Sequence, residues 1–287
     1  MAEPGSLKSI RHGLEAALAR GLFAALAALP TERASAVGGW LARTIGPLTS
    51  ADRTARHNME RALPHLDAAT RGRAVTAAWD NFGRTMAEYA LLPRFAREQR
   101  VHVSGAERLA PYQDKPVLLF CAHLANWEVI PLALTGRTKP LTIVYRAANN
   151  PKVDALIARA RAPYTAGMVP KGASGAREIV KALKQGEHVI MVVDQKLNTG
   201  LEVPFFGRGA FTAPAVVSFA MHYGCPVFPV RTRRVGACHF EVAVEEPLTF
   251  AADGDLGEGL AAVNRRLEEW ITQEPGQWLW MHKRWRE

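Results

Sequence analysis

The sequence is poor in cysteine and has no cysteine pair at the spacing of a metal or redox motif. Its three cysteines, Cys121, Cys225 and Cys238, are odd in number and lie far apart in the 287-residue chain. A disulfide framework or a structural zinc site is therefore not expected, and a reducing compartment suits the chain. A nucleophile elbow and a Walker loop are also missing, so neither a serine hydrolase nor a P-loop nucleotide-binding protein is indicated.

The sequence also lacks an apolar run long enough to span a bilayer. Apolar residues recur at helical spacing from Leu7 to Leu29, but four charged residues interrupt them, the last at Arg20. Such a helix can lie in the membrane interface, pack on the protein's own core, or be removed as a signal peptide. We assign residues 1–30 to an N-terminal membrane-associated helix and residues 31–287 to the main domain.

The composition indicates a folded basic protein. Apolar residues make up 48% of the chain and charged residues 22%, which is typical of globular domains. The formal net charge is +9, with 36 Lys and Arg against 27 Asp and Glu. This excess suggests an acidic partner, which can be nucleic acid, an anionic membrane or an acidic carrier protein.

Periodicity divides the main domain into a helical part, 31–100, and a part in which strands and helices alternate, 101–287. Helices are predicted at 31–45 and 67–92 in the first part. In the second part, strands are predicted at 117–121, 141–145, 189–194, 227–232 and 240–244. Helices are predicted between or after them at 127–134, 151–161, 175–185, 214–223 and 256–272. The alternation, with nearly all-apolar strands, predicts an α/β fold with a mostly parallel central sheet flanked by helices and a helical N-terminal region.

Polar side chains follow three of the predicted strands, where open α/β sheets bind their ligands. His123 and Glu128 follow the first strand, Arg146 and Asn149 the second, and Asp194 and Gln195 the third. Three strand ends with polar groups indicate a site at this edge of the sheet.

His123 and Glu128 are the best candidates for catalysis. On a continuous helix, residues five apart point in different directions, so the two side chains can meet only if a turn separates them. Asn126 is a good N-cap residue and would start the helix after such a turn. Glu128 would then orient the imidazole, and His123 would act as a general base that takes a proton from a hydroxyl.

Three further features leave alternatives open. Arg146 and Arg161 can bind an anion or stabilise an oxyanion, or lie at the surface. The apolar segment Val203–Gly207 can line an acyl-chain pocket or pack in the core. The aromatic and basic segment Gln277–Trp285 fits base stacking, a membrane interface or ordinary packing of the chain end.

With these motifs in view, the sequence resembles the bacterial lipid A biosynthesis acyltransferases, the late lauroyl or myristoyl transferases. The matching segments, in chain order, are Arg56–Met59, Asn81–Arg84, Glu88–Tyr89, His123–Glu128, Tyr145–Arg146, Asn149–Pro151, Arg161, Lys171–Ala173, Asp194–Gln195, Val203–Gly207 and Gln277–Trp285. Each match is weak by itself, but their order and spacing together are specific, and they extend from about residue 10 to the end.

The resemblance implies a glycerolipid acyltransferase-like fold and an enzyme that uses no metal or dissociable cofactor. It implies acyl transfer from acyl carrier protein to a lipid A precursor at the cytoplasmic face of the bacterial inner membrane. The partners would be these two substrates and the membrane surface, and not nucleic acid. His123 would be the general base, Glu128 its partner and Arg161 a catalytic or substrate-binding residue. Asn126, Arg146, Asn149, Asp194 and Gln195 are the predicted substrate-binding residues.

Two alternatives remain at this level. The acceptor can be another glycolipid, such as a mannosylated phosphatidylinositol, or a lysophospholipid. The chain can also be a non-catalytic basic module that binds membranes or nucleic acid, in which case binding would depend strongly on salt and no acyl donor would be consumed.

Overall fold

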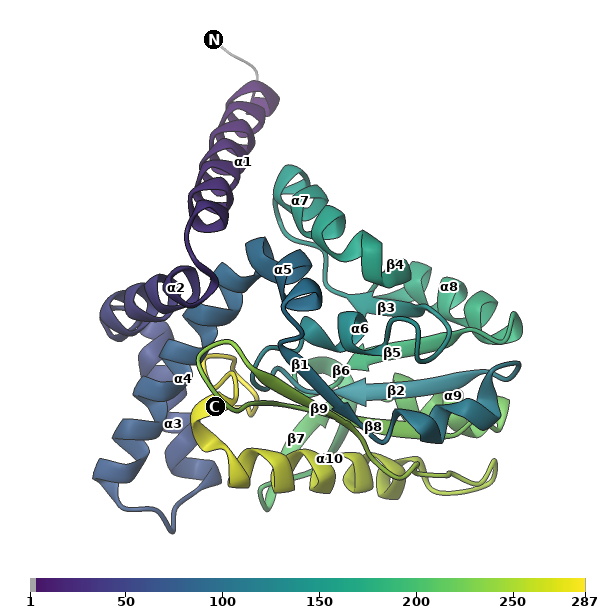
Figure 1. The fold of residues 1–287 in the computed structure, drawn as a ribbon. Helices are drawn as coiled ribbons and strands as arrows, with labels where there is room; N and C mark the ends of the chain where they lie inside the picture. Colours follow the sequence, from purple (N-terminus) through teal and green to yellow (C-terminus); the bar gives the residue numbers. More distant parts are fainter. Residues whose placement is uncertain (1–3, 287) are drawn as a thin grey trace.

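The computed structural model describes residues 4–286, with the side chains of 8–172 and 174–286. Its N-terminal helices lie on one side of the central sheet (Figure 1). These are α1 (Pro4–Ala28), α2 (Thr31–Ile45), α3 (Ser50–Ala62), α4 (Ala68–Glu88) and α5 (Leu92–Arg97). The sequence predicted α2 correctly but missed α3.

The helix predicted over 67–92 is shorter than expected. Asp67 caps α4 by accepting the Thr70 N–H, and α4 ends at Glu88. A 3₁₀ turn, η2 (Tyr89–Leu91), follows it. Pro93 lies in the first turn of α5, where its missing N–H removes no hydrogen bond. The chain therefore changes direction between α4 and α5. The turn between these helices places Tyr89 beside the carboxyl ends of the strands.

Two glycines allow α2 and α4 to cross at very short range. A Cβ atom on Gly38 would overlap the backbone oxygen of Gly83, and a Cβ atom on Gly83 would overlap the backbone oxygen of Gly38. Neither position can take a larger residue unless the helices move apart. The crossing fixes α4 against α2, and α4 in turn contacts the loop that follows the second strand of the sheet.

The central sheet has seven strands in the order β1-β9-β8-β2-β5-β3-β4. Its strands are β1 (Val101–Ser104), β2 (Val117–Cys121), β3 (Leu141–Tyr145), β4 (Thr165–Pro170), β5 (His188–Val192), β8 (Val227–Arg234) and β9 (Phe240–Val244). Only the β8–β9 pair in this sheet is antiparallel. The predicted mostly parallel sheet is confirmed. The two edge strands, β1 and β4, were missed because they are only partly buried and lack a continuous apolar run.

Helices cover both faces of the sheet. They are α6 (Val129–Leu134), α7 (Pro151–Arg161), α8 (Ala173–Lys184), α9 (Ala215–Tyr223) and α10 (Leu256–Gln273), with 3₁₀ turns η1 (Gly46–Leu48), η3 (Ala106–Tyr112), η4 (Ala162–Tyr164) and η5 (Pro275–Gln277). Strand β2 shows why two layers form: Leu118 and Phe120 pack in one hydrophobic cluster, whereas Val117 and Leu119 pack in the other. Alternate side chains of a strand point to opposite faces, so a strand buried on both sides is apolar throughout.

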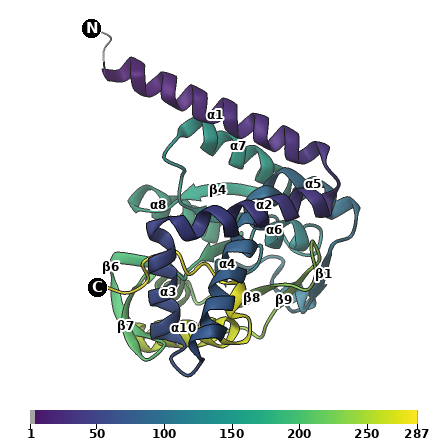
Figure 2. The same ribbon diagram turned by 90° about the vertical axis from the view of Figure 1, so that its left-hand side faces the viewer.

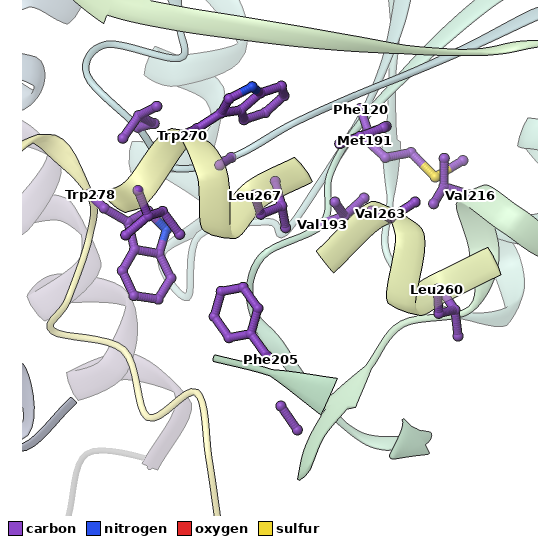
Figure 3. Packing of buried hydrophobic residues seen from close by; sticks show 14 of the residues in the cluster. Phe120, Met191, Val193, Phe205, Val216, Leu260, Val263, Leu267, Trp270 and Trp278 are labelled. Atoms are coloured by element: carbon purple, nitrogen blue, oxygen red, sulfur yellow. The ribbon is translucent and has the colours of Figure 1, made fainter. Parts of the chain in front are cut away.

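The segment Val203–Gly207 belongs to a hairpin formed by β6 (Lys196–Phe205) and β7 (Arg208–Thr212). Phe205 is fully buried and stacks on Trp285 with ring centroids 5.5 Å apart. It also contacts Trp278, near α10 in Figure 3. The core-packing interpretation of this segment is therefore confirmed.

The aromatic C-terminal segment also packs inside the protein. Trp278, Trp280 and Trp285 are 2%, 0% and 4% exposed. These indoles are not available for base stacking or for a membrane interface, so of the three interpretations the packing of the chain end is correct.

Helix α1 packs on α7, as Figure 2 shows. The Asn150 side chain joins them by donating to the His12 carbonyl at 3.0 Å and to the Glu15 carboxylate at 2.8 Å. Ala16 and Leu26 of α1 are buried. In the part of the chain that the structure describes, no helix is both long and apolar enough to cross a membrane.

The opposite face of α1 is apolar and exposed. Ile10, Leu14, Leu18 and Leu22 are 57%, 68%, 76% and 48% exposed. One side of the helix thus packs on the protein, and the other presents leucines to the surroundings. The packing interpretation is confirmed for one side of the helix, and membrane association of the other side stays a prediction.

Candidate active site

The site is built on two neighbouring parallel strands. Strands β2 and β5 pair in a register that places Cys121 opposite Val192. His123 and Asp194 each lie two residues beyond these partners, so the register brings them together at the carboxyl edge of the sheet. The site predicted at this edge therefore forms, and the neighbour of His123 is the carboxylate of the next strand.

Asp194 holds the imidazole of His123. Its Oδ1 atom lies 2.7 Å from His123 Nδ1, and its Oδ2 atom accepts the His123 backbone N–H at 2.9 Å. The indole N–H of Trp278 donates to the same Oδ2 atom at 2.6 Å. With Nδ1–H donated to Asp194, Nε2 is the basic nitrogen of the ring. The His123 side chain is 15% exposed, which leaves it accessible from the neighbouring cavity.

The surroundings of Asp194 keep it ionised. Burial by itself would raise the pKa of this carboxyl, which is 2% exposed. The charge of His123 and the hydrogen bonds from His123 and Trp278 outweigh burial and hold the pKa well below its ordinary value. An ionised Asp194 stabilises the imidazolium that forms when His123 accepts a proton.

The C-terminal segment fixes the backbone of the His123 loop. The Ala125 N–H donates to the Gln277 carbonyl at 2.9 Å, and the Leu279 N–H donates to the His123 carbonyl at 3.1 Å. Ala125 has a φ of 51°, a left-handed conformation that is unfavourable for a residue with a Cβ atom. These bonds hold the loop in a shape that its own residues would not favour.

Helix α4 holds the same loop from the other side. The Asn81 amide donates to the carbonyls of Ala125 and Gln277 at 2.9 and 3.0 Å, and the Thr85 hydroxyl donates to the Ala125 carbonyl at 3.0 Å. Arg234 of β8 donates to the Asn81 side-chain oxygen at 2.9 Å. Nothing in the sequence pattern indicated that Asn81 supports the site, because its partners lie 44 and 196 positions away.

Glu128 does not contact His123, and the sequence-based prediction of a His123–Glu128 pair is wrong. Its carboxylate accepts two hydrogen bonds from Arg161, from Nε at 2.7 Å and from Nη2 at 2.5 Å. The hydroxyl of Tyr89 donates to it at 2.5 Å. The prediction failed because it considered only neighbours in sequence, whereas Arg161 ends α7 and Tyr89 follows α4.

The Tyr89–Glu128–Arg161 cluster is a buried ion pair with a phenol attached. The side chains of Glu128 and Arg161 are 3% and 12% exposed. Although burial opposes the charged form of Arg161, the charge and hydrogen bonds of Glu128 raise the pKa of the guanidinium. Burial and then the charge of Glu128 raise the pKa of Tyr89 well above its ordinary value. Arg161 is therefore a charged guanidinium and Tyr89 a neutral phenol at neutral pH.

Asn126 shapes the loop from inside and is not placed to touch a substrate. It is fully buried, its amide donates to Glu88 at 2.8 Å, and its oxygen accepts the Glu128 N–H at 3.0 Å. The helix that follows, α6, begins at Val129 and not near Asn126 as expected. The predicted substrate contact of Asn126 is thus not supported. Asn149 is exposed and lines neither of the cavities at the site.

A cavity of about 250 Å³ opens beside His123. It is lined by His123, Tyr89, Glu128 and Arg161 together with apolar residues of β3 and β5. Trp127 forms part of its wall and meets the imidazole edge-on at 4.7 Å between ring centroids. His123 and the Glu128 cluster thus face the same space, although they do not touch each other.

A second cavity of about 430 Å³ adjoins the first, and both are lined by Arg146, Lys171 and Gln195. The walls of the second cavity are mainly apolar and come from β3, β5, α8 and α9, with residues such as Ile179, Met191, Val216 and Phe219. Arg146 and Gln195 therefore lie at the site as predicted, where polar and apolar cavities meet. Lys171 joins them at the same boundary.

Comparison with known proteins gives the family. Residues 4–287 match the family model described as bacterial lipid A biosynthesis acyltransferase. Because the match covers nearly the whole chain, this protein belongs to that family and is an acyltransferase of lipid A biosynthesis. The resemblance noted in the sequence is confirmed.

Curated relatives are similar over most of their length. A lipid A biosynthesis palmitoleoyltransferase of Escherichia coli K12 is 27% identical over 251 residues, which cover 80% of this chain and 77% of the relative. A lipid A biosynthesis lauroyltransferase of the same organism is 24% identical over 237 residues, which cover 79% and 76%. A lipid A biosynthesis acyltransferase of Haemophilus influenzae is 22% identical over 267 residues, which cover 89% and 82%.

Among solved structures, the 1-acyl-sn-glycerophosphate acyltransferase PlsC of Thermotoga maritima matches with a TM-score of 0.38 and 15% identity. The match covers 76% of this chain and 96% of PlsC.

Proposed function

We propose that this protein transfers a fatty acyl chain from acyl carrier protein to a hydroxyl of a lipid A precursor, as a late secondary acylation in lipopolysaccharide biosynthesis. The observation that carries the proposal is the His123–Asp194 pair at the floor of a cavity in a lipid A acyltransferase. This pair can supply the proton transfers that ester formation from a thioester requires.

His123 and Asp194 perform the proton transfers. Nε2 of His123 accepts the proton of the acceptor hydroxyl while the hydroxyl oxygen attacks the thioester carbonyl. The carbon–sulfur bond then breaks, and the carrier thiol leaves with the proton that His123 holds. Asp194 keeps Nδ1 protonated and stabilises the imidazolium between the two transfers.

The Glu128–Arg161 pair positions a guanidinium at the same cavity. Two nitrogens of Arg161, Nε and Nη2, bond to Glu128, and Nη2 also donates to Tyr89. The third nitrogen, Nη1, has no partner among the described residues and can donate to a substrate oxygen. We assign Arg161 to binding of the acceptor or stabilisation of the oxyanion, and Glu128 to holding Arg161 in place.

The second cavity is suited to the acyl chain of the donor. Its walls are mainly apolar, and its volume of about 430 Å³ lies in the range of small-molecule pockets. Arg146 and Lys171 at the boundary of the two cavities place positive charge beside the reacting carbonyl. Positive charge there suits an acidic carrier protein and a phosphorylated glycolipid.

The exposed leucines of α1 suit work at a membrane surface, which for this reaction would be the cytoplasmic face of the inner membrane. Apolar side chains on one face of a helix insert into the headgroup region, and basic residues such as Lys8 and Arg11 favour anionic lipids. The helix would lie on the membrane while its other face packs on α7.

The direct test is transfer by the purified protein. Acylated carrier protein and a lipid A precursor are incubated with wild type, His123→Ala and Glu128→Ala, and the product is identified by mass spectrometry. We expect both variants to lose transfer while they keep the wild-type fold and vesicle binding. The exposed His65→Ala serves as the control and should retain full activity.

The same experiment examines the acceptor. Product from a mannosylated phosphatidylinositol or a lysophospholipid, but not from the lipid A precursor, would refute the proposed acceptor. Lipid A from a strain that lacks the gene, with and without complementation by His123→Ala, gives the corresponding test in cells.

A further inference from the structure

A groove lies on the outer surface of the N-terminal helices, away from the catalytic cavity. It has a volume of about 360 Å³ and is formed by α1, α2 and α4. We call it the α2–α4 groove; residues that line it include Phe23, Leu41, Ala42, Ile45, Phe82 and Met86. None of its lining residues lines the cavity beside His123.

The groove exists because of the close helix crossing described above. Gly38 and Gly83, which allow α2 and α4 to touch, both line it. Trp79 of α4 forms another part of the wall, and its indole N–H donates to Asp52 of α3 at 2.8 Å. The indole N–H, which is the one polar group of this side chain, is thus bonded to Asp52 and not exposed in the groove. The groove surface is almost entirely apolar.

The mouth of the groove is exposed to the surroundings and is also apolar. Ile45 and Leu22, which line the groove, are 55% and 48% exposed. Trp40 and Leu48, on α2 and η1, are 54% and 84% exposed. Soluble surfaces seldom collect large apolar side chains in one place unless a partner covers them.

A cavity with cationic lining adjoins the groove. Thr49 lines the groove, and the next residues in the sequence, Ser50 and Ala51, line this cationic cavity, so the two lie close together at the turn before α3. Arg53 and His57 of α3 lie in its wall, and Arg53 is exposed. Lys283 from the C-terminal segment contributes a further cation.

We propose that an anionic membrane phospholipid binds here, with one alkyl chain in the α2–α4 groove and its phosphate against Arg53. The apolar groove and the cationic cavity lie side by side, as the tail and head of such a lipid do. Positive charge at the head site excludes a neutral lipid as the preferred occupant. The lack of shared lining with the His123 cavity favours a resident membrane lipid over the acceptor that reacts.

The site gives α2 a role that the membrane-associated α1 does not explain. A lipid held between α1, α2 and α4 anchors the whole helical part of the protein to the bilayer surface, and α4 also carries Asn81 and Thr85 against the His123 loop. The inference does not depend on the proposed acyl transfer, because the site lies apart from His123.

The test uses monomeric short-chain lipids and the full chain. Titration calorimetry with dihexanoylphosphatidylglycerol, below its micelle concentration, should show saturable binding of one lipid per chain. Dihexanoylphosphatidylcholine should bind at least about fivefold more weakly, because its choline cation cancels the net negative charge of the headgroup, and the attraction of a net anionic lipid to one cation is worth about a factor of five. A single-site isotherm for a monomeric lipid separates a built site from general adsorption to a bilayer.

Variants locate the two parts of the site. Arg53→Ser should weaken phosphatidylglycerol binding by about fivefold. Ile45→Glu should abolish it by placing a charge at the mouth of the groove. The matched controls Arg137→Ser and Val235→Glu change exposed residues elsewhere and should bind as wild type does. His123→Ala should keep full binding even though transfer is lost, which separates this inference from the catalytic proposal.

Three results would overturn the inference. One is no saturable binding of monomeric phosphatidylglycerol to wild type. Another is that the wild-type protein binds phosphatidylglycerol and phosphatidylcholine with equal affinity. The third is displacement of phosphatidylglycerol by the lipid A precursor together with a raised KM for that precursor in Arg53→Ser, since this would make the acceptor the occupant.

Discussion

Replacement of Asp194 by asparagine tests the central feature of the site. The substitution keeps the size of the side chain but removes the charge that faces His123. The amide oxygen can still accept the two hydrogen bonds that reach Oδ2, from the His123 backbone and Trp278, but the oxygen that faces His123 Nδ1 is replaced by the NH₂ group. With the NH₂ group facing Nδ1, the imidazole proton moves to Nε2 and the ring can no longer act as the base.

The expected loss follows from these contacts. In a comparable buried His–Asp pair, replacement of the Asp by Asn lowers kcat by about 10⁴-fold. The histidine then has the wrong tautomer, and its imidazolium form is no longer stabilised. At 25 °C this corresponds to about 5.5 kcal/mol of transition-state stabilisation. Asp194 is 2% exposed and its pKa is well below the ordinary value, so solvent does little to screen its charge. We therefore expect a loss of about 10³- to 10⁴-fold in kcat, with a much smaller change in KM.

Steady-state kinetics with acylated carrier protein and precursor measure the effect, and circular dichroism and thermal unfolding check the fold. Glu245→Gln is the matched control, because Glu245 also accepts an indole N–H, from Trp270 at 2.9 Å, but lies away from the cavity. It should leave kcat nearly unchanged. A folded Asp194→Asn variant that keeps more than about a tenth of wild-type kcat would refute the assignment of Asp194 as the partner of His123.

Three further predictions concern stability and its dependence on pH. Burial lowers the pKa of His282 to about 4, so the imidazole binds a proton more readily in the unfolded chain than in the folded one. The folded state is therefore most stable, with respect to this group, above about pH 6.5, and it loses that stability as the pH falls toward 4. His282→Gln should flatten the decrease of the melting temperature over that range, and an unchanged slope would contradict this account. Arg161→Met leaves Glu128 buried without its cation and should lower the free energy of unfolding by about 3–5 kcal/mol in urea titrations. The double variant Glu128→Gln/Arg161→Met should recover part of that loss, and simple additivity of the two changes would argue against the coupling. Tyr89→Phe removes a hydrogen bond to a buried carboxylate and should cost about 2 kcal/mol in the same titration, with transfer reduced but still present; a loss of transfer equal to that of His123→Ala would assign the phenol to catalysis instead.

The class of fold and the edge of the sheet where the site lies could both be predicted from the amino-acid sequence. The apolar runs at 117–121, 141–145 and 240–244 correspond to β2, β3 and β9 without error, and the helices at 31–45 and 151–161 correspond to α2 and α7. These predictions are correct because burial on both faces and helical periodicity are local patterns that a sequence displays directly. His123, Asp194 and Arg161 were singled out because each lies near the end of a regular element. The substrate-binding role predicted for Asp194 is not supported, because its carboxylate is buried against His123 and Trp278.

Only the tertiary structure decided which of these groups meet. His123 pairs with Asp194 because β2 and β5 are neighbours in parallel register, and strand order is not visible in a local pattern. Glu128 meets Arg161 because the end of α7 lies beside the loop that follows β2, and the support that Asn81 gives the loop depends on partners 44 and 196 positions away. Contacts between residues so distant in sequence form only when the whole core packs. The chemical groups can therefore be read from the sequence, but their partners depend on the tertiary packing.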